Sequence, residues 1–215
     1  MARGLFITFE GSEGCGKSTQ LQRLAERLRA LDREVVATRE PGGTEIGEHL
    51  RQLLQFSQAG HAMQPETELL LFTASRAQLV RQLIAPALAR GALVLADRFL
   101  DSTTVYQGVA RRIDPAQVAA INAFAVGACV PALTFVLDLD PAEARARLQQ
   151  RAQPGGAPDR MESQPAAFYE AVRRGYLQLA AADPHRIKVL DASRTVAALE
   201  SEIWRAVEEK LRVES

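Results

Sequence analysis

Residues 11–18 carry the strongest chemical signal in this sequence. They read Gly-Ser-Glu-Gly-Cys-Gly-Lys-Ser and satisfy the pattern G-x-x-x-x-G-K-[ST] of a phosphate-binding loop. In such a loop, glycines let consecutive backbone N–H groups turn inward around phosphate oxygens. Lys17 is expected to reach the β- and γ-phosphates of a nucleotide, and the Ser18 hydroxyl to bind Mg²⁺. The predicted nucleotide-binding residues are Gly11, Ser12, Glu13, Gly14, Cys15, Gly16, Lys17, Ser18 and Thr19.

The segments on both sides of this loop agree with that interpretation. Residues 5–9 form a continuous apolar run, as expected of a buried parallel strand. After the loop, leucines recur at helical spacing, at Leu21, Leu24, Leu28 and Leu31. A helix is therefore predicted to begin where its N-terminus can face an anion. The alternative, a chance glycine-rich turn, does not account for both flanking elements.

Size and composition limit the classes of protein that remain. The chain has 215 residues, 47% of them hydrophobic and 24% charged, with a formal net charge of zero. It is long enough for a single α/β domain, here residues 1–215, and lacks the basic excess typical of a nucleic-acid partner. Cys15 and Cys129 form no disulfide framework. The first strand begins too early for a signal peptide, and no apolar run reaches the ~18–20 residues of a membrane span. We expect a cytoplasmic protein with no membrane or nucleic-acid partner.

Predicted strands and helices alternate along the whole chain. The strands are expected at 5–9, 34–39, 93–96, 133–137 and 187–190. Most of them are apolar without alternation, which is typical of a parallel sheet covered on both faces. The predicted fold class is therefore α/β, a P-loop NTPase with a five-stranded parallel sheet and helices on both faces. Ligands in such sheets bind beyond the carboxyl ends of the strands.

Two pairs of residues outside the loop, Asp97 with Arg98 and Phe72 with Arg76, have side chains that suit nucleotide binding. Asp97 follows an apolar strand, where an acidic residue helps to hold Mg²⁺ in P-loop proteins, although a helix cap is the alternative. Arg98 beside it places a fixed cation where a second phosphate group can bind. Phe72 and Arg76 lie four residues apart on one helix face. Together they can stack on a base and bond its edge, whereas Phe72 alone suits a core equally well.

A segment rich in proline and glycine, 153–158, is bracketed by arginines. Arg147 and Arg151 share a helix face at i, i+4, where like charges repel unless an anion lies between them. A lid at about 147–160 that closes over phosphates is therefore predicted. The alternative is a solvated helix face, which suits Arg145 best.

These features together resemble the thymidylate kinases, which make dTDP from dTMP and ATP. The resemblance runs from the first strand to the last helix, and the type with arginines in the lid matches best. The motifs that carry it are 9–18, 39–44, 72–76, 97–98, 102–108 and 159–162. The departures are Phe99, where tyrosine or histidine is often seen, and a slightly long lid with two prolines. The resemblance implies the nucleoside-monophosphate kinase type of fold, ATP and Mg²⁺ as cofactors, and a homodimer.

The resemblance also implies how the substrate base is recognised. It places Phe72 against thymine and Arg76 at the edge of the base. Thr103 and Gln107 help to select the base.

A further set of residues is implied for the phosphate and sugar of dTMP. Arg39 and Arg98 hold the dTMP phosphate, and Pro41 packs nearby. Glu13 and Tyr106 lie near the deoxyribose 3′-hydroxyl.

The predicted reaction is transfer of the ATP γ-phosphoryl group to dTMP. The acceptor phosphate is already an oxyanion, so alignment and charge neutralisation should supply the catalysis. The catalytic residues are predicted to be Lys17, Arg98, Arg147 and Arg151, and the metal ligands Ser18 and Asp97. Two alternatives remain: a regulatory nucleotide switch, although the chain has no N-K-x-D guanine motif, and a small kinase for another nucleotide or metabolite.

Substitution of the loop lysine tests the phosphate-loop assignment. Lys17→Ala is expected to lower turnover by several orders of magnitude, because the ammonium neutralises charge on the transferred group. Lys17→Arg is not expected to restore it, since a planar guanidinium does not replace a compact ammonium. Steady-state kinetics with circular dichroism to verify folding make the measurement. Near-normal activity in a folded Lys17→Ala protein would refute the assignment.

Overall fold

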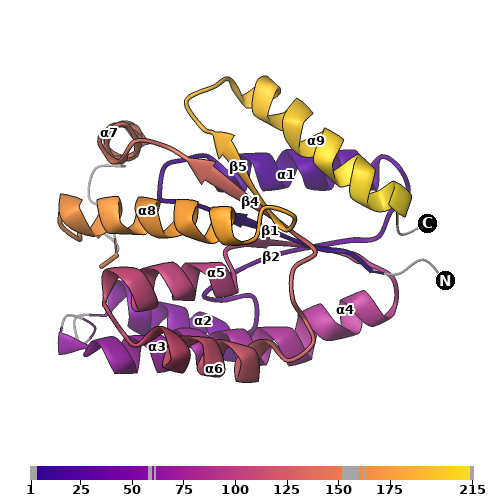
Figure 1. Ribbon diagram of the computed structural model, residues 1–215. Helices are drawn as coiled ribbons and strands as arrows, with labels where there is room; N and C mark the ends of the chain where they lie inside the picture. The colour runs from indigo at the N-terminus through magenta and orange to yellow at the C-terminus, as the bar shows by residue number, and fades with distance from the viewer. Residues whose placement is uncertain (1–3, 58–59, 61, 152–159, 162, 214–215) are drawn as a thin grey trace.

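The computed structural model describes residues 4–57, 60, 62–151, 160–161 and 163–213. Its centre is a sheet of five parallel strands in the order β2-β3-β1-β4-β5 (Figure 1). The strands are β1 (Phe6–Glu10), β2 (Val35–Arg39), β3 (Leu93–Asp97), β4 (Leu133–Asp138) and β5 (Ile187–Asp191). The predicted fold class is confirmed, and each predicted strand is present with shifts of at most one residue at its ends.

Helices cover both faces of this sheet. They are α1 (Lys17–Arg29), α2 (Glu45–Arg51), α3 (Pro65–Leu79), α4 (Ala85–Ala89), α5 (Leu100–Thr103), α6 (Pro115–Val126), α7 (Pro141–Arg151), α8 (Ala166–Ala182) and α9 (Val196–Val213). Figure 1 shows α1 and α9 on one side of the sheet, with α3, α4, α5, α6 and α8 on the other. Within the described ranges, no helix has both the length and the apolar character needed to cross a membrane.

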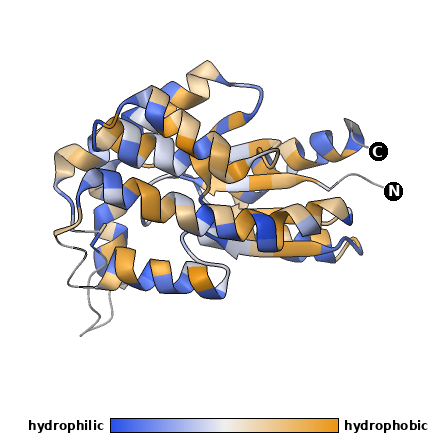
Figure 2. Cartoon of the chain, turned by 90° about the horizontal axis from the view of Figure 1, so that it is seen from below, coloured by the Kyte–Doolittle hydropathy of each residue, from blue (hydrophilic) through white to orange (hydrophobic). Residues whose placement is uncertain are grey.

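The side chains of the central strand alternate between two hydrophobic clusters. Ile7 and Phe9 pack with leucines of α1 and with α9, and both are fully buried. Phe6 points to the opposite face and packs with residues of α3, α4 and α6. Because both faces are covered, the strand carries apolar residues on both of them, and Figure 2 shows hydrophobic strands in the interior. This burial on two faces fixes β1 at the centre of the sheet.

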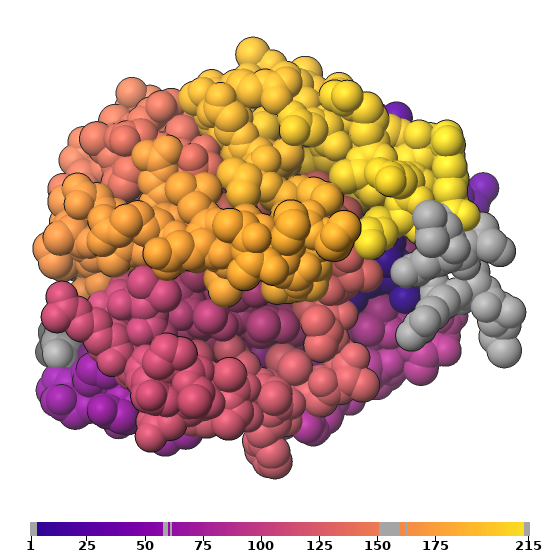
Figure 3. Space-filling model, in the orientation of Figure 1, coloured from indigo at the N-terminus to yellow at the C-terminus, as the bar shows by residue number. Residues whose placement is uncertain are grey.

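A third cluster attaches α8 to the face that carries the site. Val172 and Tyr176 of α8 are buried against Val105 and Tyr106 of the neighbouring helical segment. In the space-filling view α8 is the orange band across the middle of the molecule (Figure 3). Tyr106 and Tyr176 also meet edge to face, with ring centroids 6.4 Å apart.

Several helices begin and end at residues that local chemistry predicts. Asp114 caps α6 by accepting a hydrogen bond from the Gln117 N–H, and a proline takes the first helical position. The helical segment from α3 to α4 is continuous and contains a π-helical stretch, Val80–Ile84. This wider turn lies just before Pro86, which has no N–H to donate.

One helical segment was not predicted from the sequence. α5 continues as a π-helical stretch over Thr104–Ala110. The segment 102–105 contains two threonines and a valine, and β-branched residues have low helix propensity. Packing against α6 and α8 overrides that propensity here.

Candidate active site

The phosphate loop connects β1 to α1. It needs glycine at two positions where its backbone lies close to neighbouring elements. Gly11 and Gly14 both have positive φ, 129° and 78°. A Cβ atom added to Gly11 would lie 2.6 Å from the Leu137 carbonyl oxygen, and one added to Gly14 would lie 2.6 Å from that of Ala144. Any side chain at these positions would push the loop away from β4 and α7. The glycines therefore fix the loop against the carboxyl edge of the sheet.

The lysine and serine of the loop both bond to nearby protein groups. Lys17 is buried, and its Nζ donates to the carbonyl oxygens of Ser12 at 2.7 Å and Gly11 at 3.3 Å. Ser18 Oγ donates to Asp97 Oδ2 at 2.6 Å. Because β1 pairs with β3 and Phe9 lies opposite Asp97, the sheet itself brings this acid to the loop. The two predicted metal ligands are thus brought together.

Oxygen donors of this kind suit a hard divalent cation. Mg²⁺ is usually held by one or two protein oxygens, with waters and substrate phosphates completing an octahedron. In the described ranges, no group of three or more His, Cys, Asp and Glu side chains is arranged to hold a metal by itself. The pair of Ser18 and Asp97 therefore fits a metal that arrives with a phosphate ligand.

Arg98 links the loop to the neighbouring helices. Its Nη2 donates to Glu13 Oε1 at 2.6 Å, and its Nη1 donates to Ser102 Oγ and to the Tyr176 hydroxyl, both at 3.3 Å. Burial would raise the pKa of Glu13, but the charges of Arg98 and Lys17 outweigh it and hold that pKa below its ordinary value. Arg98 is thus a cation held beside the phosphate loop by an ionised partner.

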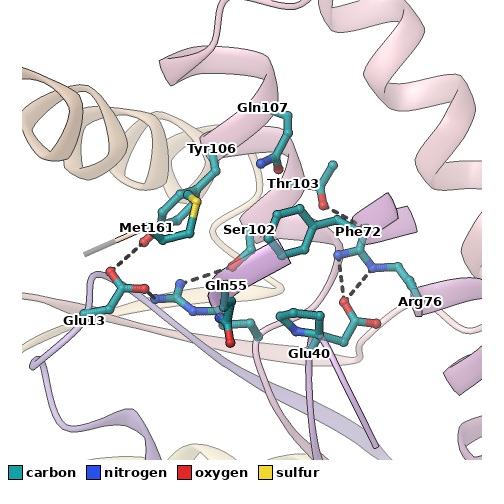
Figure 4. Close-up of a pocket in the computed structure, with 12 residues that line it drawn as sticks. Glu13, Glu40, Gln55, Phe72, Arg76, Ser102, Thr103, Tyr106, Gln107 and Met161 are labelled. Carbon is teal, nitrogen blue, oxygen red and sulfur yellow. Dashed lines mark hydrogen bonds and ion pairs between the residues drawn. The ribbon is translucent and has the colours of Figure 1, made fainter. Parts of the chain in front are cut away.

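A pocket opens between Arg98 and the α3 helix. It encloses about 400 Å³, part of it open to solvent. Its walls are Glu13, Glu40, Pro41, Gln55, Phe72, Arg76, Arg98, Ser102, Thr103, Tyr106, Gln107 and Met161. In Figure 4 the Phe72 ring faces the cavity, with Thr103 and Gln107 above it and Glu13 at the far end. The half-buried Phe72 therefore lines a cavity with one flat aromatic wall and an ionic end, and is not a core residue.

Arg76 is fixed in the wall of this pocket by protein partners. The side chain is 1% exposed. Its Nε donates to Glu40 Oε2 at 2.8 Å, and its Nη1 donates to Thr103 Oγ1 at 3.0 Å and Asn122 Oδ1 at 2.8 Å. Its Nη2 donates to the Phe99 carbonyl oxygen at 3.1 Å. All three nitrogens have partners, so a base that bonds Arg76 must share donors already in use.

Glu40 is the buried counter-charge of Arg76. Burial raises the pKa of Glu40 to about 7, although the Arg76 guanidinium opposes the shift. Its second oxygen, Oε1, is buried and has no hydrogen-bond partner among the described residues. Burial of this ion pair is therefore costly, and loss of either partner is expected to destabilise the fold.

Other predicted residues lie outside this pocket. Arg39 is exposed and donates to both carboxylate oxygens of Glu48, at 3.0 and 2.9 Å. Arg147 donates to Glu143 and to the Ala192 carbonyl oxygen. Arg151 is the last residue of α7, and its side chain, like 152–159 of the predicted lid, lies outside the described residues. The roles assigned to these arginines stay predictions.

The sequence did not single out four pocket residues. They are Glu40, Gln55, Ser102 and Met161. Glu40, Ser102 and Met161 lie inside the segments 39–44, 102–108 and 159–162 that carry the resemblance, and that location was the available signal. Gln55 gave no signal, because it reaches the pocket only through the path of the chain after α2.

Removal of Arg76 tests how far it also supports the fold. Arg76→Ala leaves Glu40 buried without its partner, and at a pH well above the Glu40 pKa of about 7 we expect the free energy of unfolding to fall by about 3–5 kcal/mol. Arg90→Ala breaks an exposed pair with Glu34 and should cost at most about 1 kcal/mol. Denaturant titration measures both. A loss as small as that of the control would show that Glu40 takes up a proton when Arg76 is absent.

Comparison with known proteins agrees with this geometry. A sequence model of the family described as Thymidylate kinase matches residues 9–203. A thymidylate kinase of Deinococcus radiodurans is 48% identical over 210 residues, which cover 98% of this chain and 99% of the relative. One of Geobacter sulfurreducens is 48% identical over 197 residues, 91% of this chain and 92% of the relative. The crystal structure of thymidylate kinase from Ehrlichia chaffeensis has a TM-score of 0.76 at 33% identity and covers 96% of this chain and 99% of that one. The chain belongs to the thymidylate kinase family.

Proposed function

We propose that this chain transfers the γ-phosphoryl group of ATP to dTMP and releases dTDP and ADP. The observation that carries the proposal is the position of Glu13 and Arg98. Glu13 belongs to the phosphate loop, and both residues line the pocket that Phe72 closes at its other end. A nucleoside monophosphate in that pocket would point its phosphate at the loop that holds ATP.

The chemistry needs alignment and positive charge more than a base. The phosphate of dTMP is already anionic and is itself the nucleophile. Charge spreads over the oxygens of the transferred group, and fixed cations stabilise it most where water is excluded. Lys17 from the loop and Arg98 from the pocket would supply these cations. To bind the substrate phosphate, Arg98 would either release Glu13 or bond to both groups at once.

Mg²⁺ would be held by Ser18 and Asp97, whose oxygens are already in contact. When bound, the ion neutralises the β- and γ-phosphates of ATP. Before it binds, Asp97 holds the Ser18 hydroxyl in place. The remaining loop residues from Gly11 to Thr19 would contribute backbone N–H groups to the phosphates.

Base and sugar are assigned to the walls of the pocket. Phe72 would stack on thymine, and Arg76, Thr103 and Gln107 would face its polar edge. Pro41 and Tyr106 close the cavity near the sugar and phosphate. Arg39 would have to leave Glu48 to reach the dTMP phosphate.

We assign a lid to residues at about 147–160 of a single domain, 1–215. α7 begins directly after β4, and its residue Ala144 approaches the glycine at position 14 of the loop. The start of α7 is therefore fixed beside the phosphate loop, and its far end would lead into the lid. Arg151, and to a lesser extent Arg147, would engage the transferred group when the lid closes.

A homodimer in the cytoplasm completes the proposal. The outward face of α6 is exposed and apolar, with Phe124 81% exposed. On the adjacent α3, Leu70 is 56% exposed. Seen from below in Figure 2, the helices on this side of the sheet carry hydrophobic as well as hydrophilic residues. An apolar surface of this kind suits a self-complementary contact between two copies.

A panel of monophosphates tests the reaction itself. With ATP and Mg²⁺, we expect dTMP to give the highest kcat/KM among dTMP, dCMP, dAMP and dGMP, because the pocket is assigned to a pyrimidine that stacks on Phe72. A coupled assay for ADP measures the rates. Hydrolysis of ATP at the same rate with and without any monophosphate would favour a nucleotide switch instead.

The lid arginine is tested by separating turnover from binding. Arg151→Ala is expected to lower kcat at least tenfold with the dTMP dissociation constant nearly unchanged, because the side chain acts mainly in the closed, reacting state. Arg145→Ala, on the exposed side of the same helix, serves as the matched control and should change little. If Arg151→Ala keeps its kcat, or loses only affinity for dTMP, the clamp assignment is wrong.

The dimer surface is tested by a charge at its centre. Phe124→Asp is expected to shift the protein from dimer to monomer in light scattering after size exclusion, since two buried carboxylates would face each other. Val196→Asp, at an exposed apolar position at the start of α9, should leave the mass unchanged. A dimer that persists in Phe124→Asp would place the interface elsewhere.

A further inference from the structure

We propose that Glu68 determines the base specificity of the pocket by fixing the orientation of the Gln107 amide. In this orientation the amide oxygen of Gln107 faces the substrate and accepts a hydrogen bond from a pyrimidine N3–H. The chemical class selected is a thymine or uracil nucleotide, as opposed to a cytosine nucleotide. This inference rests on the proposed function and names the atom that reads the base.

The contact between the two residues is short and buried. Gln107 Nε2 donates to Glu68 Oε1 at 2.7 Å. Glu68 is 1% exposed and Gln107 is 2% exposed, so water does not compete for this bond. Gln107 also lines the pocket, above the Phe72 ring in Figure 4.

Glu68 offers acceptors only, because two arginines keep it ionised. Arg111 donates to it through Nε and Nη2, both at 3.2 Å, and Arg160 Nη2 pairs with Oε2 at 2.7 Å. Burial would raise the pKa of Glu68, but bonds from Arg111 and Gln107 and the charge of Arg160 hold that pKa below its ordinary value. An ionised carboxylate has no proton to donate.

The orientation of the amide follows from this chemistry. A glutamine amide has a donor end and an acceptor end, and the hydrogen-bond network decides which way it points. Since Glu68 can only accept, the NH₂ end of Gln107 must face it. In the part of the chain that the structure describes, the Gln107 side chain forms its hydrogen bond through Nε2, to Glu68, and Oε1 has no donor. That oxygen is therefore left for a ligand.

An acceptor at this place separates the pyrimidines. Thymine and uracil carry N3–H, whereas cytosine has an unprotonated N3 that would face the Gln107 oxygen lone pair to lone pair. A site whose buried polar group is left unpaired rejects a ligand strongly. The Arg76 guanidinium, which also lines the pocket and can only donate, disfavours the amino group of cytosine in the same way.

The fold explains why Glu68 reaches this position. It lies in the first turn of α3, one turn before Phe72 and two turns before Arg76, so one helix face carries three residues of the site. Glu68 also anchors Arg160, whose Nε donates to the Leu54 carbonyl oxygen at 2.9 Å. A purely structural role for Glu68 would therefore lower stability without changing the choice of base.

Glu68→Gln separates the two roles. The arginines should claim the oxygen of the new amide, and its NH₂ would then donate to Gln107 Oε1 and reverse the Gln107 amide. We expect the ratio of kcat/KM for dTMP over dCMP to fall at least tenfold, with the ratio of dTMP over dUMP unchanged. Glu34→Gln, which alters an exposed pair with Arg90, is the matched control. An unchanged dTMP to dCMP ratio overturns the proposal.

A double substitution tests whether Glu68 acts through Gln107. In a Gln107→Leu background there is no amide to reverse, so adding Glu68→Gln should leave the dTMP to dCMP ratio where Gln107→Leu puts it. If Glu68→Gln lowers the ratio equally in both backgrounds, Glu68 acts by another route and the proposal is overturned.

A third measurement uses the unaltered protein and does not depend on the variants folding. The N3-methyl analogue of dTMP has N–CH₃ in place of N3–H and keeps both carbonyl groups. We expect it to bind at least tenfold more weakly than dTMP in calorimetry. Equal binding would overturn the inference while dTMP turnover continues, whereas a lack of dTMP turnover in the unaltered protein would overturn the proposed function itself.

Discussion

The position of β1 between β3 and β4 is the constraint on which the site depends. Burial on both faces holds this strand at the centre, and its pairing with β3 places Phe9 opposite Asp97. The phosphate loop that leaves β1 must therefore meet the carboxyl end of β3. This single register brings Ser18 to Asp97, and it sets Arg98 beside the loop. A shift of one residue would separate these groups and turn their side chains to the other face.

Three buried carboxylates, those of Glu10, Glu40 and Glu68, bond to side chains of the pocket and hold them in place. Glu10 accepts from the Phe99 N–H, from Ser102 and from Tyr176, and the two hydroxyls in turn accept from Arg98. Burial, followed by the nearby Asp101, raises the pKa of Glu10. Glu40 and Glu68 hold Arg76 and Gln107 in the same manner. Each of these acids loses hydration when buried, and its bonds offset part of that cost while fixing a group that lines the pocket.

Local signals in the sequence determined the architecture and the phosphate loop. Unbroken apolar runs predicted parallel strands, and proline at the first turns of α3 and α6 marked where those helices begin. The glycine spacing of the loop predicted an anion site, and Asp97 was found where the strand pattern placed it. These features depend on backbone sterics and on residues close in sequence, so a single chain segment carries enough information to specify them.

Only the tertiary structure decided which partners the functional side chains take. Arg76 meets Glu40, Thr103 and Asn122, which lie 36, 27 and 46 residues away in sequence. The helical segment after Phe99 forms against its own propensity, because neighbouring helices bury it. Arg39 bonds Glu48 instead of lining the pocket. Long polar side chains reach several partners of equal chemistry, and packing across the sheet selects among them. The sequence therefore determined which groups are present at the site, and the fold determined how they are held.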